Sequence, residues 1–315
     1  YHLGSCSWKP VYTMSCTPSA AKPITARLEA VISQTSGMDW KETEIQLING
    51  NAGSAILPEL RQWHIGSAAE SSASPMPAAL GAPRAKMMAL NDTDEEAAPD
   101  FAGSSASAAA DTGGSYVVWK PVIQGLSAGT SRVLLTEGSW QEKLFWTARP
   151  LNNDARVYIC AEHTLSAEEA VWPEGSMQLS VDGTYAGQGY FRPRDGKIFL
   201  SFGNDPRVTL TAQSEPRKKG QQGFIGAKQV WEWGWTYTVR NDRESDIEVR
   251  IERPLPVSTN KDVAVSYSGT PAPREDQKEK KLVWTATVPA RSATAIQHTV
   301  KATAPKDMEM YPVEP

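Results

Sequence analysis

Three tryptophans at alternate positions have the clearest potential of any residues in this chain to bind a ligand. Trp231, Trp233 and Trp235 lie within Val230–Arg240, where apolar and polar residues alternate strictly. Such alternation predicts a β-strand, so the three indoles should share one face of a sheet. On an exposed face they could stack on sugar rings or on the apolar surface of a partner protein. In a sandwich core they would be packing residues, and the alternation favours that second role.

Acidic residues near turns could in principle bind a metal or hydrolyse a glycosidic bond. Asp39 and the segment 203–205 (Gly-Asn-Asp) follow expected strands. A metal site would need several converging oxygen ligands, whereas hydrogen bonding within the turn is the commoner role. Glu168 and Glu169 are adjacent and cannot readily face each other across a cleft as a glycosidase pair must. We expect both to lie on a solvated face.

The histidines and cysteines also lack the spacing of a known site. The histidines are His2, His64, His163 and His298, and none belongs to an HExxH pattern. His163 follows Glu162 on an expected strand, so the two side chains should point to opposite faces. The cysteines Cys6, Cys16 and Cys160 include no CxxC pair. Cys6 and Cys16 could form a disulfide across neighbouring strands, but three buried thiols are the commoner arrangement. The sequence therefore predicts no catalytic residue, no metal site and no cofactor.

Length and charge restrict the kind of partner. The chain has 315 residues, 40% hydrophobic residues and a net charge of −4. This length suits about two domains, and the negative charge argues against a general nucleic-acid binder. No apolar run is long enough to span a membrane. The chain begins at Tyr1 without a leader pattern, which we interpret as a fragment of a longer protein.

The elements that must position these residues are β-strands. Before the insert, residues 5–16 contain Pro10, which predicts an edge or bulged strand. Residues 24–34 alternate and should form a strand half-buried in a sheet. Gly37 supplies a turn, and a second alternating run at 42–48 predicts a hairpin with the strand 24–34.

Residues 66–115 differ in composition from the rest of the chain. They are mostly Ala, Ser, Gly, Pro and Asp, with few bulky side chains. Such a segment cannot bury enough apolar surface to offset the entropy lost on ordering. We therefore predict a long flexible insert.

Strand signals return after the insert and continue to residue 305. Asp182-Gly183 is the strongest hairpin signal, and Ser166 with Glu169 predicts a capped helical turn. We expect a charged break at 215–220 and a solvated loop at 269–281. The further expected strands are 130–136, 141–148, 155–162, 177–182, 184–191, 196–201, 206–212, 230–240, 246–253, 262–267, 281–288 and 293–302.

Several segments together resemble the bacterial mucoidy inhibitor A-like family, and more narrowly its C-terminal β domain, a domain of unknown function. The resemblance covers nearly the whole chain because the segments occur in the family's order. These segments are Ser7-Trp8-Lys9-Pro10-Val11-Tyr12, Thr35-Ser36-Gly37-Met38-Asp39-Trp40, Val181-Asp182-Gly183-Thr184-Tyr185-Ala186-Gly187, Ser201-Phe202-Gly203-Asn204-Asp205-Pro206-Arg207-Val208 and Pro254-Leu255-Pro256-Val257-Ser258. The resemblance implies that an N-terminal domain of the same chain is missing here. It also implies an extracytoplasmic location, in the periplasm, on the cell surface or secreted.

These observations predict an all-β protein of two packed sandwich-like units, the second immunoglobulin-like. The first unit comprises 1–65 and 116–214, interrupted by the insert 66–115, the second comprises 216–305, and 306–315 is a tail. We expect a non-enzymatic binding or structural module of the bacterial envelope, with a protein or a surface glycan as partner and Trp231, Trp233 and Trp235 as candidate binding residues. The alternative is a hydrolase acting on surface polysaccharide or protein through an unrecognised site.

Overall fold

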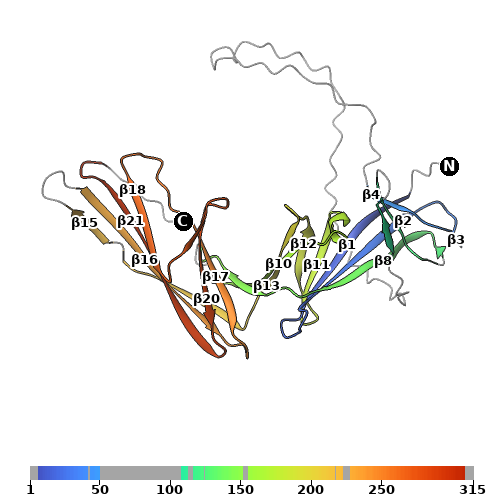
Figure 1. Ribbon diagram of the computed structural model, residues 1–315, viewed down its shortest axis with the longest axis horizontal. Coiled ribbons are helices and arrows are strands. Elements are labelled where there is room, and N and C mark those ends of the chain that lie inside the picture. The colour runs from blue at the N-terminus through green and yellow to red at the C-terminus, as the bar shows by residue number, and fades with distance from the viewer. Residues whose placement is uncertain are drawn as a thin grey trace, which may run out of the picture. The chain divides into compact units, whose positions relative to one another are not determined.

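The protein is built almost entirely of β-strands (Figure 1). A computed structural model describes residues 6–41, 43–49, 108–112, 116–123, 125–151, 155–216, 218–222 and 228–308. The prediction of an all-β fold with packed sheets is confirmed. The greater part of the expected insert, 66–107, lies outside the described residues, as do His2 and His64.

The strands follow one another with short connections. Those up to residue 148 are β1 (Cys6–Cys16), β2 (Ile24–Gln34), β3 (Trp40–Lys41), β4 (Leu47–Asn49), β5 (Ala109–Asp111), β6 (Val117–Lys120), β7 (Gly125–Leu126), β8 (Gly129–Trp140) and β9 (Phe145–Ala148). Next come β10 (Val157–Thr164), the short 3₁₀ turn η1 (Glu169–Val171), β11 (Gly175–Val181), β12 (Thr184–Phe191), β13 (Lys197–Asn204) and β14 (Val208–Ser214). The last are β15 (Lys218–Gln222), β16 (Lys228–Asn241), β17 (Ile247–Pro254), β18 (Ala264–Thr270), β19 (Arg274–Asp276), β20 (Lys281–Val288) and β21 (Ser292–Pro305).

Three larger sheets organise these strands. The first has the order β12-β11-β1-β2-β8, the second β13-β10-β9-β17-β20-β19, and the third β14-β16-β21-β18 with β15 also paired to β16. The small sheets β3-β7 and β4-β6-β5 complete the described pairings. Since β5 is made from residues 109–111, the expected flexible insert extends too far: its end is a strand paired with β6.

The first strand is only partly the edge strand that its proline predicted. Pro10 lies in the half of β1 that pairs with β2 alone. From Val11 to Cys16 the strand also pairs in parallel with β11, so this half is central. The edge prediction is therefore right for the proline and wrong for the residues after it. A proline removes one backbone donor, and it affects only the edge on which that donor would have paired.

Gly175 occupies the point where β11 joins β1, and a larger residue should not fit there. A Cβ atom at Gly175 would lie 2.6 Å from the backbone oxygen of Pro10, whereas one at Gly189 would meet only the flexible Met177 Cε at 2.8 Å. We expect Gly175→Ala to lower the free energy of unfolding by about 2 kcal/mol, and Gly189→Ala by less than about 1 kcal/mol. Urea denaturation of both variants checks this, and equal losses would contradict it.

The chain contains one of the two hairpins that the sequence predicts. Asp182 and Gly183 both have positive φ, 48° and 78°, and they join β11 to β12 as expected. The hairpin of 24–34 with 42–48 is wrong, because β2 pairs with β1 and β8 while β3 and β4 pair with β7 and β6. Gly37 has positive φ as expected, but the turn turns the chain away from β2 rather than back along it.

The second sheet runs without interruption across the break expected at 215–220. Its strands β9 and β17 pair in parallel, although they lie on opposite sides of that break. Residues 218–222 form β15 and residues 274–276 form β19, so both segments expected as polar loops contain a strand. The division into domains at 215 stays a prediction, which limited proteolysis would test.

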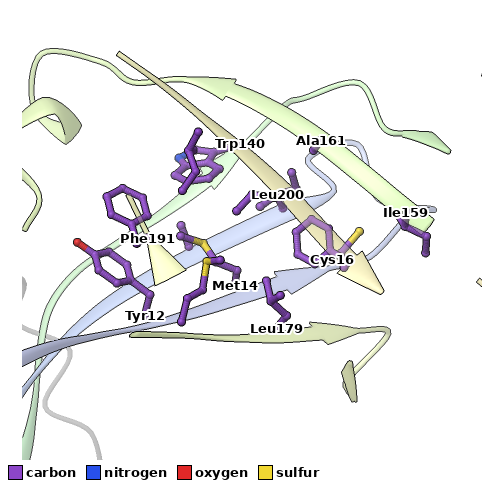
Figure 2. Close-up of a cluster of buried hydrophobic side chains, with 14 of the residues drawn as sticks. Tyr12, Met14, Cys16, Trp140, Ile159, Ala161, Leu179, Phe191 and Leu200 are labelled. Atoms are coloured by element: carbon purple, nitrogen blue, oxygen red, sulfur yellow. The ribbon is translucent and has the colours of Figure 1, made fainter. Parts of the chain in front are cut away.

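A contiguous cluster of buried side chains joins the sheets. In the first sheet the core face of β1 carries Tyr12, Met14 and Cys16, and the Tyr12 ring stacks on Phe191 with 4.2 Å between centroids. Figure 2 shows these residues with their neighbours from β8, β10, β11 and β13. Burial of this kind is the main favourable contribution to folding, and it fixes the register of each alternating strand.

Candidate functional site

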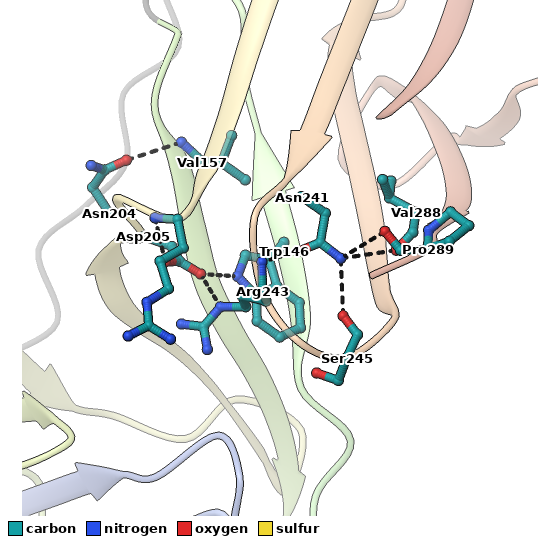
Figure 3. Close-up of polar contacts among 10 residues, drawn as sticks. Trp146, Val157, Asn204, Asp205, Asn241, Arg243, Ser245, Val288 and Pro289 are labelled. Carbon is teal, nitrogen blue, oxygen red and sulfur yellow. Dashed lines mark hydrogen bonds and ion pairs between the residues drawn. The ribbon is translucent and has the colours of Figure 1, made fainter. Parts of the chain in front are cut away.

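A buried carboxylate, Asp205, connects three separate parts of the chain. It lies in the turn after β13 and is 1% exposed. Its Oδ2 accepts hydrogen bonds from Trp146 Nε1 in β9 and Arg243 Nε after β16, each at 2.6 Å, as Figure 3 shows. Its Oδ1 accepts the backbone N–H of Arg207. The expected local turn role is therefore present, together with a long-range ion pair that the sequence did not reveal.

Asparagine side chains extend this connection on both sides. Asn204 Oδ1 accepts the backbone N–H of Val157. Asn241, fully buried at the end of β16, donates through Nδ2 to the carbonyls of Ser245, Val288 and Pro289 (Figure 3). All these partners are protein groups that hold turns and strand ends together. The group around Asp205 is thus satisfied internally and holds the fold in place.

A second polar cluster surrounds His163 on β10. Its Nδ1 lies 2.8 Å from Glu142 Oε1 and its Nε2 lies 2.9 Å from Glu169 Oε2. The ring stacks on Trp140 at 3.8 Å between centroids, and Trp140 Nε1 donates to Glu169 Oε1 at 2.6 Å. A ring nitrogen that donates to a carboxylate has no free lone pair with which to accept a proton. In this arrangement His163 acts as a hydrogen-bonded packing group.

The acidic pair at 168–169 is not solvated as a whole. Glu168 is exposed, but the Glu169 side chain is 12% exposed and bonded to His163. Burial alone would raise the pKa of Glu169, but hydrogen bonds from Ser166 and His163 outweigh it and hold the pKa below 4.5. Ser166 and Glu169 also bond each other's backbone N–H, which confirms the predicted capped turn.

The tryptophan stripe lies on β16 and is largely covered. Trp231 and Trp233 are each 8% exposed, and Trp235 is partly buried. The first two indoles form a small cluster with apolar side chains of β18, β21 and the turn before β18, namely Val263, Val265, Val300 and Ala302. Their low exposure leaves little ring area for a ligand. A binding role for the three residues stays a prediction.

No metal site is present among the described residues, where no three histidine, cysteine or acidic side chains come together. Asp39 Oδ1 accepts the backbone N–H of Ala128, so this carboxylate joins two turns. Glu162 and His163 point to opposite faces as predicted, since Glu162 is exposed and pairs with Lys197.

The three cysteines are free thiols. Cys6 and Cys16 stand at opposite ends of one strand, about 30 Å apart at the usual rise per residue. The disulfide that the sequence left open is therefore absent. Burial raises the pKa of Cys16 to about 12 and also raises that of Cys160, which makes both thiols unreactive.

Thiol labelling should distinguish these cysteines. In native protein at about pH 8, we expect an aromatic disulfide reagent to modify Cys6, which is partly exposed, and to spare the two buried thiols until the chain unfolds. Absorbance of the released thiolate measures this. Rapid labelling of native Cys6→Ser protein would contradict it.

The residues that complete these clusters came from parts of the sequence that showed no motif. Trp146 and Arg243 lie 59 and 38 residues from Asp205, and Glu142 lies 21 residues from His163. One signal was available: Arg253 and Asn241 continue the apolar face of their alternating strands, so a buried polar side chain was expected at each.

The fold and its internally bonded polar clusters define an all-β protein without a recognised catalytic arrangement among the described residues. Residues 1–306 match the family described as a domain of unknown function (DUF4139), so the chain belongs to that family. No curated protein and no solved structure matches the chain. Among the described residues, no helix is long and apolar enough to cross a bilayer.

Proposed function

We propose that this chain is a non-enzymatic binding or structural module of the bacterial cell envelope, with a protein or a surface glycan as its partner. The observation that supports binding is a set of exposed aromatic side chains on β12 and β13. Tyr185, Tyr190 and Phe199 are 61%, 53% and 53% exposed. Exposed rings beside polar groups bind sugars and protein surfaces well, because each ring offers an apolar face and each tyrosine a hydroxyl.

The sheet register supports this use of the two tyrosines. Tyr190 pairs with Ser176 and Tyr185 with Ser180, and a register shift lies between them. Since Ser176 and Ser180 are four residues apart on β11, both tyrosines lie on the outer face of the first sheet. The Arg192 guanidinium carbon lies 5.2 Å from the centre of the Tyr190 ring and helps to orient it.

The envelope location, the mucoidy inhibitor A-like assignment and the missing N-terminal domain rest on the sequence motifs. The matched family agrees with the C-terminal β domain of unknown function that the motifs indicated. The extracytoplasmic location is tested by fractionation of cells that produce the full-length protein. Recovery in the cytoplasm would contradict it.

Loss of partner binding in a tyrosine variant tests the binding role. We expect Tyr185→Ala/Tyr190→Ala to weaken capture of envelope proteins or arrayed glycans by about tenfold or more, since aromatic anchors carry much of the energy of an interface. Tyr116→Ala is the matched control, because Tyr116 is equally exposed at 53% but precedes β6. Equal capture by the double variant and the control would refute the proposal.

The alternative, a hydrolase acting on surface polysaccharide or protein, has one observation in its favour. The His163 cluster brings two carboxylates to one imidazole. Turnover of such substrates by the full-length protein, abolished by Glu142→Gln without a change in melting temperature, would favour it. Retained binding with no turnover would favour the module.

A further inference from the structure

Four buried side chains with unpaired polar atoms come together between the second and third sheets. They are Arg253 on β17, Trp284 on β20, Tyr237 on β16 and His298 on β21, and they are 4%, 0%, 1% and 2% exposed. The His298 ring lies 4.6 Å from the ring of Trp284 and 6.4 Å from that of Tyr237. Trp235 joins the group, with His298 at 5.0 Å and the Arg253 guanidinium carbon at 5.3 Å from its ring.

This group holds most of the unpaired buried polar atoms in the described part of the chain. Eight buried side-chain nitrogen or oxygen atoms lack a hydrogen-bond partner there, and five of them belong to these four residues. They are Arg253 Nε, Trp284 Nε1, Tyr237 Oη and both ring nitrogens of His298. Buried polar groups in folded proteins nearly always have partners, so such a concentration indicates an occupant that the chain itself does not supply.

The charge of the group indicates what the occupant is. Arg253 donates from Nη1 to the Pro150 carbonyl, and within the described residues no carboxylate lies at ion-pair distance from it. The adjacent Glu252 points to the other face, where Arg149 and Lys281 hold it. A buried cation without a counter-charge costs several kcal/mol. A negatively charged occupant would remove that cost.

The hydrogen-bonding capacity of the group agrees with its charge. Arginine and tryptophan side chains can only donate, the tyrosine hydroxyl can donate, and a neutral histidine donates from one nitrogen. The group therefore offers at least four donors, while its obligatory acceptor is the second nitrogen of His298. A water molecule needs acceptors for its own two hydrogens, whereas an anion needs donors only.

We propose that Arg253, Tyr237 and His298 bind a small monovalent anion, either a halide or the carboxylate group of a small molecule. The anion accepts hydrogen bonds from Arg253 Nε–H, the Tyr237 hydroxyl and a His298 N–H. It neutralises the guanidinium and fixes β17 against β16 and β21. This site is separate from the tyrosines on β12 and stands whether or not they bind a partner.

Crystals of the protein test the site directly. We expect a crystal soaked in bromide to show an anomalous peak in contact with Arg253 Nε, and a crystal soaked in formate to show a planar density there if carboxylates also enter. The two soaks distinguish the sources of the anion. A water at this position in both soaks, or no density at all, would overturn the proposal.

Solution stability gives a second test. At constant ionic strength, replacing gluconate, which is too large for a buried site, by chloride should raise the unfolding midpoint of the wild type, because a ligand that binds only the folded state stabilises it. Arg253→Met should abolish the chloride effect and Tyr237→Phe should weaken it. Arg149→Met, a change on the opposite face, should keep it in full. The same chloride effect in all four proteins would overturn the proposal, and Tyr237→Phe keeps the test valid if Arg253→Met does not fold.

Discussion

Replacing Asp205 by asparagine should lower the free energy of unfolding by about 3–5 kcal/mol, the usual cost of leaving a buried ionic partner alone. The variant keeps the shape of the side chain but removes its charge. Arg243, whose side chain is 14% exposed, then loses its counter-ion, and Trp146 Nε1 loses a charged acceptor. Because Asp205 joins β9 to two turns, the loss should affect the whole second sheet. Chemical denaturation monitored by circular dichroism measures it.

Two further variants make this prediction specific. Asp195→Asn removes an ion pair with Lys278 in which both side chains are more than 80% exposed. Such a pair contributes little, so the change should cost less than about 0.5 kcal/mol. Asp205→Asn/Arg243→Met removes both charges together and should recover part of the loss. A loss no larger for Asp205→Asn than for Asp195→Asn would contradict the role assigned to the buried pair.

The sequence predicted the strands well because each is encoded locally. The period-two pattern of β16 and β17, and the Asp-Gly turn between β11 and β12, depend on neighbouring residues alone. Which strand pairs with which depends on contacts between distant segments. For this reason the hairpin expected after β2 was wrong, and the parallel pairing of β9 with β17 was not foreseen.

The candidate sites show the same limit in their chemistry. His163 and Asp205 carried a signal in the sequence, but their partners Glu142 and Arg243 belong to other elements and have no motif of their own. The pairing of Glu168 with Glu169 was judged from sequence adjacency, whereas a 3₁₀ turn directs Glu169 toward His163. Composition and periodicity indicate that a polar residue is buried. They do not indicate which charge meets it.

His298 should make the protein less stable in mild acid, and His298→Phe should remove this sensitivity. Burial, and secondarily the nearby Arg253 cation, lower the pKa of His298 from 6.5 to about 4. Between these values the unfolded chain binds a proton that the folded chain does not. Stability is therefore complete above pH 6.5 and falls as the pH decreases toward 4, by up to about 3 kcal/mol.

The relevant pH window separates this histidine from the carboxylates. Hydrogen bonds and ion pairs hold the pKa values of Glu169, Glu248 and Glu252 below 4.5, despite the opposing effect of burial, so their contributions are lost only below that pH. Urea denaturation from pH 7 to pH 4.5, in buffer without small anions that could bind beside Arg253, should show a steeper decline for the wild type than for His298→Phe. Phenylalanine keeps a flat ring between Trp235 and Trp284 and leaves no unpaired nitrogen, so its own cost should be small and independent of pH. Parallel declines for the two proteins would mean that His298 titrates as it does in the unfolded chain, and that the interior around Arg253 is open to solvent.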